Sequence, residues 1–436
     1  GGVSAPARPL RVGIAGLGTV GGGVLRLLRT NAGLLAARTG RALAVTAVSA
    51  RDPGLRRDGL DLEGLRWHSD ARALAEDPEV DLVCELIGGS DGIALELATT
   101  ALRHGRAVVT ANKAMLAHHG AELAALAEAN GVALGYEAAV AGGIPIIKSL
   151  RQGLAANRIE RVYGILNGTC NFILTTMRET GREFADVLAE AQALGYAEAD
   201  PSFDVDGVDA AHKLALLAAL AFGGRPRFDA IEIEGIRHVS AVDIAFADQL
   251  GYRIKLLGVA RMTPLGLEQR MSPCMVPAAA PIAQVEGVFN GVVVEGDQVG
   301  AVVHEGRGAG AGPTASAVVA DIVDIARGLE VPAFGIPAAA LQDHPIAPIS
   351  AHQGCYYIRL MVLDQPGVLA DVAAVLRDHD VSIESLIQRG RNPGQAVPIV
   401  LTSHDTTEAA MRGALDQIAA LAAVLEPPRM IRIENS

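Results

Sequence analysis

The first third of the chain alternates short apolar runs with stretches of helical periodicity. The apolar runs are LRVGIA (10–15), LAVTAVS (43–49), VDLVCELIGG (80–89), AVVTANK (107–113) and VALGYEAAV (132–140). Between them, as in residues 121–130, apolar residues recur with the spacing of amphipathic helices. Strands that alternate with helices are typical of a doubly wound parallel sheet. We therefore predict an α/β domain over residues 1–140.

The middle of the chain mixes helical and strand patterns. Residues 208–222 have helical periodicity, and their second half is apolar throughout, which predicts a buried helix. The segment VVVEGDQVGAVVHEG (292–306) predicts a hairpin that turns near Gly296 and Asp297. We predict a second, α+β domain over residues 141–311.

The last part of the chain begins with a helix and a proline-rich connection. Pro313 stands near the start of the predicted helix, and residues 312–336 are expected to pack back on the first domain. Residues 337–353 contain several prolines and are interpreted as a linker. Residues 354–436 then repeat a strand, helix and strand pattern, which predicts a compact third domain of two βαβ-like halves.

Charge and hydropathy exclude some classes of partner. The net charge is −12, and no run of Lys or Arg offers a surface to nucleic acid or an anionic membrane. No apolar run reaches membrane-spanning length, and the N-terminal residues lead into a strand rather than through a signal-peptide core. We therefore expect a cytoplasmic protein that binds neither nucleic acid nor membranes.

The cysteines and histidines lack the spacing of a disulfide framework or a zinc site. Four cysteines lie far apart, at positions 84, 170, 274 and 355, without a CxxC pair. His118 and His119 have no third partner at a metal-ligand spacing. Reduced thiols are expected, and a structural zinc is not.

A glycine-rich turn predicts a dinucleotide site. Gly16, Gly18 and Gly21 in GLGTVG follow a predicted strand and begin a predicted helix. Glycines at these positions allow a tight turn and let a pyrophosphate approach the helix N-terminus. A tight strand-to-helix turn without a ligand is the alternative.

The end of the second predicted strand bears on which dinucleotide binds. It reads VSARD, where Ser49 and Arg51 would suit the 2′-phosphate of NADP. Asp52 stands alongside and would suit the ribose hydroxyls of NAD instead. NADP(H) is favoured and NAD(H) stays open, since Arg51 is equally consistent with a solvated surface residue.

Residues 195–213, GYAEADPSFDVDGVDAAHK, concentrate carboxylates before a lysine. An EF-hand alignment with Gly207 at the sixth loop position puts Lys213 at the twelfth, where a glutamate is required, so calcium is excluded. Asp209 and Lys213 are four residues apart and share one face of the predicted helix. They form either a surface ion pair or, with Glu198, a site that moves a proton and binds an amine.

These motifs together resemble the homoserine dehydrogenase family over nearly the whole chain. The further motifs that carry the resemblance are TANKA (110–114), YEAAVAGGIPII (136–147), LNGTCNFIL (166–174) and GAGAGPTASAV (308–318). DQPGVLADVAAVL (364–376) is similar to the turn and helix of an ACT domain. The resemblance implies a Rossmann-type first domain, a central substrate and dimerisation domain, and a ferredoxin-like ACT domain over residues 354–436. The implied reaction is the NAD(P)-dependent interconversion of L-homoserine and L-aspartate 4-semialdehyde, toward threonine and methionine.

The resemblance also implies roles for single residues. Lys213 would be the proton donor to the aldehyde oxygen, Asp209 would share the substrate site, and Glu198 would bind homoserine. Lys113 would act between cofactor and substrate. The cofactor-binding residues would be Gly16, Gly18, Thr19, Val20, Gly21, Ser49, Arg51, Thr110, Lys113 and Gly310.

A monovalent cation site is implied as well. The ligands of sodium or potassium would be the Glu137 carboxylate and the carbonyl groups of Val140, Gly142 and Ile144. Glu137 as an ordinary buried acid is the alternative. Cys170 stands where the family often has threonine, and inert packing is favoured there over a redox role.

The terminal domain implies regulation and self-association. Asp364, Gly367 and Val368 lie at the turn where ACT domains often bind amino acids, so threonine is the expected inhibitor. A purely assembling module is the alternative, and a homodimer or homotetramer is expected. Two rival functions remain: another ACT-containing dehydrogenase of an amino-acid pathway, or a nonenzymatic sensor of dinucleotide and amino acid.

Overall fold

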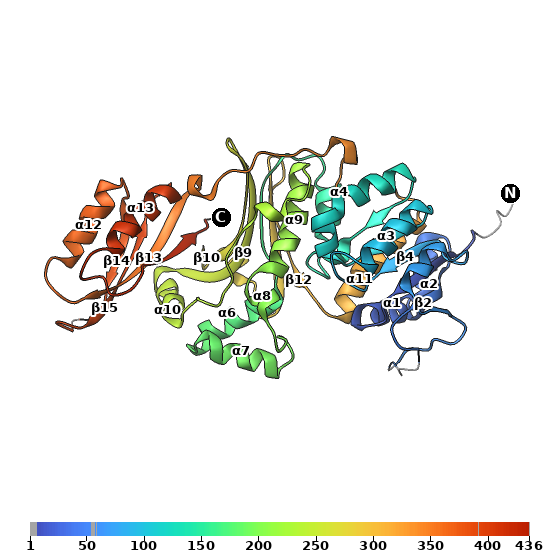
Figure 1. Cartoon of the computed structure of the whole chain (residues 1–436), viewed down its shortest axis with the longest axis horizontal. Helices are drawn as coiled ribbons and strands as arrows, with labels where there is room; N and C mark the ends of the chain where they lie inside the picture. The colour runs from blue at the N-terminus through green and yellow to red at the C-terminus, as the bar shows by residue number, and fades with distance from the viewer. Residues whose placement is uncertain (1–6, 54–56, 58, 391, 436) are drawn as a thin grey trace.

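The computed structural model of the protein describes residues 7–53, 57, 59–390 and 392–435. Residues 1–6, part of the N-terminal stretch in which no signal peptide is expected, lie outside this range. The chain runs along the long axis of the molecule, from the blue N-terminal region to the red C-terminal region (Figure 1). Among the described residues, no helix has the length and apolarity needed to cross a membrane.

A six-stranded sheet forms the N-terminal region, and all of its strand pairs are parallel. Its order is β3-β2-β1-β4-β5-β6, in which the direction of winding reverses between β1 and β4. This confirms the predicted doubly wound fold. The strands are β1 (Leu10–Ala15), β2 (Leu43–Ser49), β3 (Arg66–His68), β4 (Leu82–Glu85), β5 (Ala107–Thr110) and β6 (Leu134–Gly135). The helices are α1 (Thr19–Thr30), α2 (Ala32–Thr39), α3 (Ile93–Arg103) and α4 (Lys113–Ala129).

Helix α11 (Ala311–Ala326) returns from the middle of the chain to this sheet. Its residues Val318 and Ile322 belong to the same apolar core as Val24 of α1 and Ile14 of β1. The two helices approach closely, because a Cβ on Gly23 would lie 2.9 Å from the Ala311 carbonyl oxygen. The first domain is therefore completed by a distant segment.

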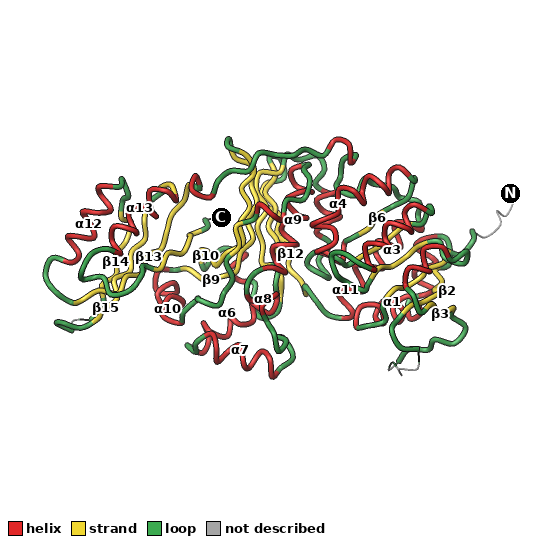
Figure 2. Tube along the Cα trace, in the orientation of Figure 1, coloured by secondary structure: helices red, strands yellow, loops and turns green. Residues whose placement is uncertain are grey.

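A mostly antiparallel sheet with helices against it forms the central region (Figure 2). Helix α9 begins and ends at the predicted residues, and its apolar positions pack on β7, β9 and β10. The predicted hairpin is confirmed, with Gly296 paired to Gly300. The strands are β7 (Ile159–Ile165), β8 (Glu232–Ile233), β9 (Tyr252–Thr263), β10 (Gly266–Pro277), β11 (Phe289–Gly296) and β12 (Gly300–Arg307). The helices are α5 (Ile146–Lys148), α6 (Gly168–Thr180), α7 (Phe184–Ala193), α8 (Ser202–Val205), α9 (Val208–Phe222) and α10 (Ala241–Leu250).

The C-terminal region is a βαββαβ unit with the strand order β17-β13-β15-β14, as expected of a ferredoxin-like fold. Its two helices cover one apolar core with the sheet. The strands are β13 (Gln353–Leu363), β14 (Ile383–Gln388), β15 (Ala396–Ser403), β16 (Thr406–Thr407) and β17 (Arg429–Ile433). The helices are α12 (Val368–Asp378) and α13 (Glu408–Ala419).

The central and C-terminal regions share one continuous sheet, which the sequence did not predict. Strand β17 pairs in parallel with β10, at Cys274 with Arg432 and at Met275 with Ile433. Buried ion pairs cross the same junction: Arg270 contacts Glu434. Backbone pairing of this kind fixes the C-terminal region against the central sheet, so it is not a freely tethered module.

Candidate active site

The Asp209 carboxylate joins two lysine side chains from different domains. Its Oδ2 atom lies 2.8 Å from Lys213 Nζ, one turn further along α9. Its Oδ1 atom lies 2.9 Å from Lys113 Nζ, which belongs to α4 of the first domain. The side chain of Asp209 is only 7 % exposed. The predicted pairing of Asp209 with Lys213 is present, and it is buried rather than a surface ion pair.

Helix N-termini hold these charged groups. Asp209 lies in the first turn of α9, after Gly207 in the left-handed conformation with φ of 85°. Lys113 is the first residue of α4, and the Asn112 side chain caps that helix by accepting a hydrogen bond from the Met115 N–H. Since helix N-termini carry partial positive charge, they favour Asp209 as a carboxylate and any anion formed between them.

The pKa of Asp209 reports the balance of forces in this cluster. Burial alone would raise the pKa, because it disfavours the charged form. The ammonium groups of Lys213 and Lys113 outweigh burial, with help from a hydrogen bond donated by Asn167, and hold the pKa well below its ordinary value. Asp209 is therefore a carboxylate throughout the physiological pH range.

Three further groups complete the cluster, and no role was predicted for any of them from the sequence. The Leu166 carbonyl accepts a hydrogen bond of 2.7 Å from Lys213 Nζ. The Asn167 amide donates to Asp204 at 2.8 Å and to Asp209 at 2.9 Å, while its oxygen caps α6. Burial, followed by the charge of Asp209, raises the pKa of Asp204. A possible signal was Asn167 itself, an N-cap residue type directly before a helical pattern.

Glu198 is placed differently from the two lysines. Its side chain is exposed, in the loop that precedes α8. Its backbone carbonyl accepts a hydrogen bond of 3.0 Å from Gln192 Nε2. The hydrogen bonds and ion pairs of the described residues do not join the Glu198 carboxylate to Asp209 or Lys213.

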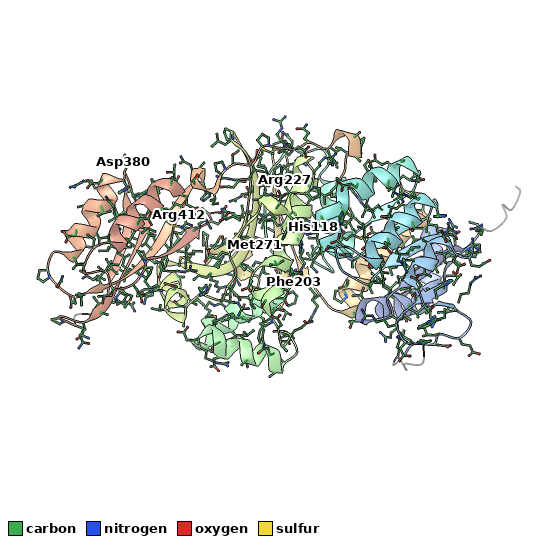
Figure 3. All side chains as sticks on the ribbon, viewed as in Figure 1. His118, Phe203, Arg227, Met271, Asp380 and Arg412 are labelled. Atoms are coloured by element: carbon green, nitrogen blue, oxygen red, sulfur yellow. The ribbon has the colours of Figure 1, made fainter. Side chains whose placement is uncertain are left out.

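An aromatic cluster packs the two domains together beside Lys113. His212 of α9 stacks on Phe228 with ring centroids 4.2 Å apart, and His118 of α4 meets Phe228 edge-on at 5.3 Å. Lys113 Nζ lies 5.6 Å from the ring centroid of Phe203; Figure 3 labels His118 and Phe203. Burial, then the nearby His118, lowers the pKa of His212 to about 4. His212 is therefore neutral near pH 7, and it is a packing residue here.

The glycine-rich turn fits a dinucleotide pyrophosphate. A Cβ on Gly21 would lie 1.8 Å from the Gly16 carbonyl oxygen, so the turn and helix α1 pack without room for a side chain. A Cβ on Gly18 would have no atom within 4 Å, which leaves open space at the N-cap. No side chain caps α1, so its first N–H groups face that space. Thr19 and Val20, also expected to bind the cofactor, are its first two residues.

Some of the remaining residues expected to bind the cofactor lie near this turn. Ser49 ends β2, and its carbonyl accepts a 2.8 Å hydrogen bond from the Gly16 N–H. Arg51 follows on the exposed surface. Gly310, with φ of 117°, precedes α11 where that helix meets α1. Thr110 is fully buried, and its hydroxyl is hydrogen-bonded within the protein.

Glu137 lies in a buried, polar corner that directly follows β6 and packs against α11. Its carboxylate accepts hydrogen bonds from the backbone N–H groups of Ile147 and Lys148. Burial, then the charge of Asp321, raises the pKa of Glu137 to about 7. Among the backbone hydrogen bonds of the described residues, the Ile144 carbonyl accepts one, whereas those of Val140 and Gly142 accept none.

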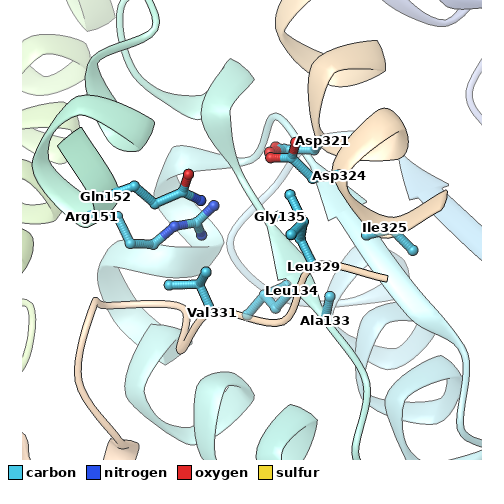
Figure 4. Close-up of a pocket in the computed structure, with 10 residues that line it drawn as sticks. All are labelled: Ala133, Leu134, Gly135, Arg151, Gln152, Asp321, Asp324, Ile325, Leu329 and Val331. Atoms are coloured by element: carbon cyan, nitrogen blue, oxygen red, sulfur yellow. The ribbon is translucent and has the colours of Figure 1, made fainter. Parts of the chain in front are cut away.

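A small cavity borders this corner (Figure 4). Arg151 and Gln152 face Asp321 and Asp324 across it. Its volume of about 20 Å³ is room for little more than one water molecule. The Lys148 ammonium already pairs with both aspartates, so the cavity is no site for an organic ligand.

The predicted effector residues line an open cavity at the start of α12. Gly367 adopts the left-handed conformation with φ of 88° directly before Val368, and both line the cavity with Asp364 and Gln388. The Asp364 carboxylate accepts a hydrogen bond of 2.6 Å from the Asn392 N–H. A polar and partly apolar hollow of this kind is suited to a small amino acid.

The cysteines are all free thiols. Cys170 is buried beside the cluster, where its Sγ atom donates to the Asp204 carbonyl at 3.2 Å. Burial raises the pKa of the Cys170 thiol well above its ordinary value, which makes it a poor nucleophile. Among the described residues, no group of three or more His, Cys, Asp or Glu side chains is placed to hold a metal ion.

Comparison with known families gives matches along most of the chain. The profile described as "Homoserine dehydrogenase, NAD binding domain" matches residues 16–137. The profile described as "Homoserine dehydrogenase" matches residues 145–323, and "ACT domain" matches residues 356–423.

Full-length relatives and solved structures are similar as well. The chain is 49 % identical to a homoserine dehydrogenase of Pseudomonas aeruginosa, with 98 % of this chain and 99 % of the relative covered. A crystal structure of a homoserine dehydrogenase from Thiobacillus denitrificans superposes with a TM-score of 0.91 at 46 % identity and covers 98 % of both chains. A hyperthermophilic archaeal homoserine dehydrogenase in complex with NADPH superposes with a TM-score of 0.62 at 28 % identity. It covers 74 % of this chain and 99 % of the archaeal one.

Proposed function

This chain belongs to the homoserine dehydrogenase family, and from that premise we propose how its residues carry out the reaction. It is an oxidoreductase that interconverts L-homoserine and L-aspartate 4-semialdehyde with a nicotinamide dinucleotide. The observation that carries the assignment of roles is the Lys213–Asp209–Lys113 cluster, because it lies where the dinucleotide-binding domain meets the buried helix α9.

In the proposed mechanism, Lys213 moves the proton. The bound dinucleotide supplies or accepts the hydride at its nicotinamide ring. As negative charge develops on the aldehyde oxygen, Lys213 Nζ donates a proton to it, and in the reverse direction Lys213 accepts the hydroxyl proton. Asp209 holds Lys213 and Lys113 together, and this places two ammonium groups where they stabilise an oxyanion.

We assign the polar end of the substrate to the carboxylates. Glu198, exposed in the loop before α8, is proposed to bind the ammonium group of homoserine. Asp209 accepts two hydrogen bonds at Oδ2, whereas Oδ1 makes only the ion pair with Lys113, which leaves acceptor capacity at Oδ1 for the substrate.

The initial rate of NADP⁺ reduction with L-homoserine, measured beside NAD⁺, tests the function. Homoserine-dependent turnover is expected, with a faster rate for NADP⁺ than for NAD⁺. The preference is supported by Ser49, which ends β2, and by the exposed Arg51 just after it, because both suit a 2′-phosphate. No turnover with either dinucleotide, from folded protein that binds both, would favour the sensor hypothesis. A faster rate with NAD⁺ would assign the ribose contact to Asp52 instead.

We also propose a monovalent cation, sodium or potassium, at Glu137 with the carbonyl groups of Val140, Gly142 and Ile144. The support is the buried Glu137 carboxylate with its raised pKa, together with the Val140 and Gly142 carbonyls, which accept no backbone hydrogen bond. Replacement of sodium and potassium by tetramethylammonium at constant ionic strength is expected to lower turnover. Equal rates in the three salts would contradict a functional cation.

Threonine is proposed to inhibit the enzyme through the terminal domain. The Asp364→Ala variant is expected to raise the half-inhibitory threonine concentration about 10-fold or more, which corresponds to the loss of one charged hydrogen bond. Its turnover without threonine should stay unchanged. Asp378→Asn, at the exposed C-terminal end of helix α12, which follows the effector turn, is the control. If the Asp364→Ala variant stays fully sensitive to threonine, the C-terminal domain would be interpreted as an assembly module instead.

Self-association and location stay predictions. We propose a homodimer at least, with a homotetramer as the larger assembly, and sedimentation velocity of the full chain distinguishes these from a monomer. The cytoplasmic location expected from the sequence is likewise untested.

A further inference from the structure

Glu85 is a buried acid that neither the glycine-rich turn nor the lysine cluster includes. It is the last residue of β4 and has no exposed surface. Its Oε2 atom accepts hydrogen bonds from the N–H groups of Ile87 at 2.8 Å and Gly88 at 3.1 Å. Its Oε1 atom accepts one of 2.8 Å from the Thr110 hydroxyl. All three partners are donors, which a carboxylate satisfies as an acceptor-only group.

These hydrogen bonds are part of a closed ring that joins Glu85, the loop after it, Thr110 and Asn112. Lys113 directly follows this ring in the sequence. The Thr110 oxygen accepts from the Asn112 N–H at 2.9 Å, so its single proton is directed at Glu85. The Asn112 amide donates a hydrogen bond of 2.6 Å to the Gly89 carbonyl. Gly89 belongs to the loop whose N–H groups bind Glu85, so this bond closes the ring. Asn112 also caps α4, whose first residue is Lys113. Glu85 thus fixes the backbone from which Lys113 extends.

The other side of the same loop packs against the glycine-rich turn. The Leu86 N–H donates to the Ala15 carbonyl at 2.9 Å. A Cβ on Gly16 would lie 2.7 Å from the Leu86 carbonyl oxygen, so the two segments are in direct contact. The ring therefore lies between the turn that fits a pyrophosphate and the lysine that pairs with Asp209.

We propose that Glu85 is a positioning residue that sets the location of Lys113 relative to the glycine-rich turn, and so the spacing between bound dinucleotide and substrate. This inference rests on the proposed role of Lys113. A reacting geometry tolerates little displacement, and a misplacement of about 1 Å is able to cost about 100-fold in rate. A buried acid that only stabilised the end of β4 would affect stability without acting through Lys113.

A double-mutant cycle of Glu85→Gln and Lys113→Met in the full-length enzyme separates these roles. Gln is nearly isosteric but presents a donor where Glu85 has an acceptor, so one link of the ring reverses. We expect Glu85→Gln to lower kcat/KM for homoserine about 10- to 100-fold. In the Lys113→Met background it should have no further effect, because residues that act through one another are not additive.

Asp77→Asn is the matched control. Asp77 is another buried acid of the same domain, and it holds the Glu79 N–H and His68 rather than α4. The effects of Asp77→Asn and Lys113→Met on kcat/KM should be additive. The change in NADPH affinity caused by Glu85→Gln should be no larger than that caused by Asp77→Asn. If Glu85→Gln fails to fold, Thr110→Val removes the same link from the other end.

Three results would overturn the inference, the third because the inference rests on the proposed role of Lys113. Additive effects of Glu85→Gln and Lys113→Met would give Glu85 an independent structural role, as would an unchanged kcat/KM in Glu85→Gln. Wild-type kcat/KM in Lys113→Met alone would instead remove the proposed role of Lys113, and this outcome is read from the single variant.

Discussion

Lys213→Ala is expected to lower homoserine turnover by about 100- to 10,000-fold, the range typical of a group that transfers a proton. The fold and the affinity for NADP(H) should be largely retained, because Asp209 keeps its ion pair with Lys113 when Lys213 is removed. Steady-state rates, NADPH fluorescence titration and thermal unfolding of the variant provide the three measurements.

Lys213→Arg separates proton transfer from charge. Arginine keeps a positive group near Asp209, yet its guanidinium stays protonated at neutral pH and does not exchange a proton with substrate. Turnover should therefore stay low in this variant as well. Near wild-type turnover in Lys213→Ala would remove the proposed role, whereas full activity in Lys213→Arg alone would reduce it to electrostatic stabilisation.

Asp209→Asn is expected to lower both turnover and stability. The amide leaves the Lys213 and Lys113 ammonium groups close together without their shared counter-charge. Breaking a buried ion pair from one side costs about 3–5 kcal/mol of unfolding free energy. Turnover should fall about 100-fold or more, because Lys213 loses the partner that orients it. Urea unfolding at pH 7 and steady-state kinetics check the two effects.

The pH dependence of this stability difference has a definite sign. The folded-state pKa of Asp209 lies below its ordinary value, so the carboxylate contributes fully above the unfolded-state pKa of about 4. The difference between wild type and Asp209→Asn should be constant from about pH 5 to 8. It should shrink as the pH falls below about 4, because Asp209 then binds a proton in the unfolded chain, whereas the folded protein keeps the carboxylate charged down to a lower pH.

Asp204→Asn is the matched control for Asp209→Asn. The pKa of Asp204 is raised, so the fold disfavours its charge, and an amide at this position should cost little stability. A second variant that adds Lys113→Met to Asp209→Asn should regain stability but not turnover. Equal unfolding free energies of wild type and Asp209→Asn would contradict a stabilising role of the carboxylate.

Local features of the molecule were predictable from the sequence. Five of the six strands of the first domain, the hairpin at Gly296 and the bounds of α9 follow from local sequence patterns, whereas the short strand β3 was not predicted. The glycine-rich turn is local only in part, since Gly21 packs against the Gly16 carbonyl of the same turn, whereas Gly16 packs against the distant Leu86. Asp209 and Lys213 were paired correctly because residues four positions apart on a helix lie on the same face.

Contacts between distant segments were beyond this reasoning. The sequence offered no local sign that Lys113 of α4 would pair with Asp209 of α9, that Asn167 would join two carboxylates, or that β17 would extend the central sheet beside β10. The apolar residues of 208–222 predicted a buried helix, but they did not decide between a surface ion pair and a buried site for Asp209 and Lys213.

The sequence by itself determined the elements and the chemical groups each one carries, because backbone periodicity, turns and caps depend on neighbouring residues. The tertiary structure alone decided which of these groups meet, which are buried, and therefore which carry a shifted pKa. That division has a physical cause: burial and ion pairing depend on how α4, α9 and the two sheets pack, and this packing minimises exposed apolar area over the whole chain.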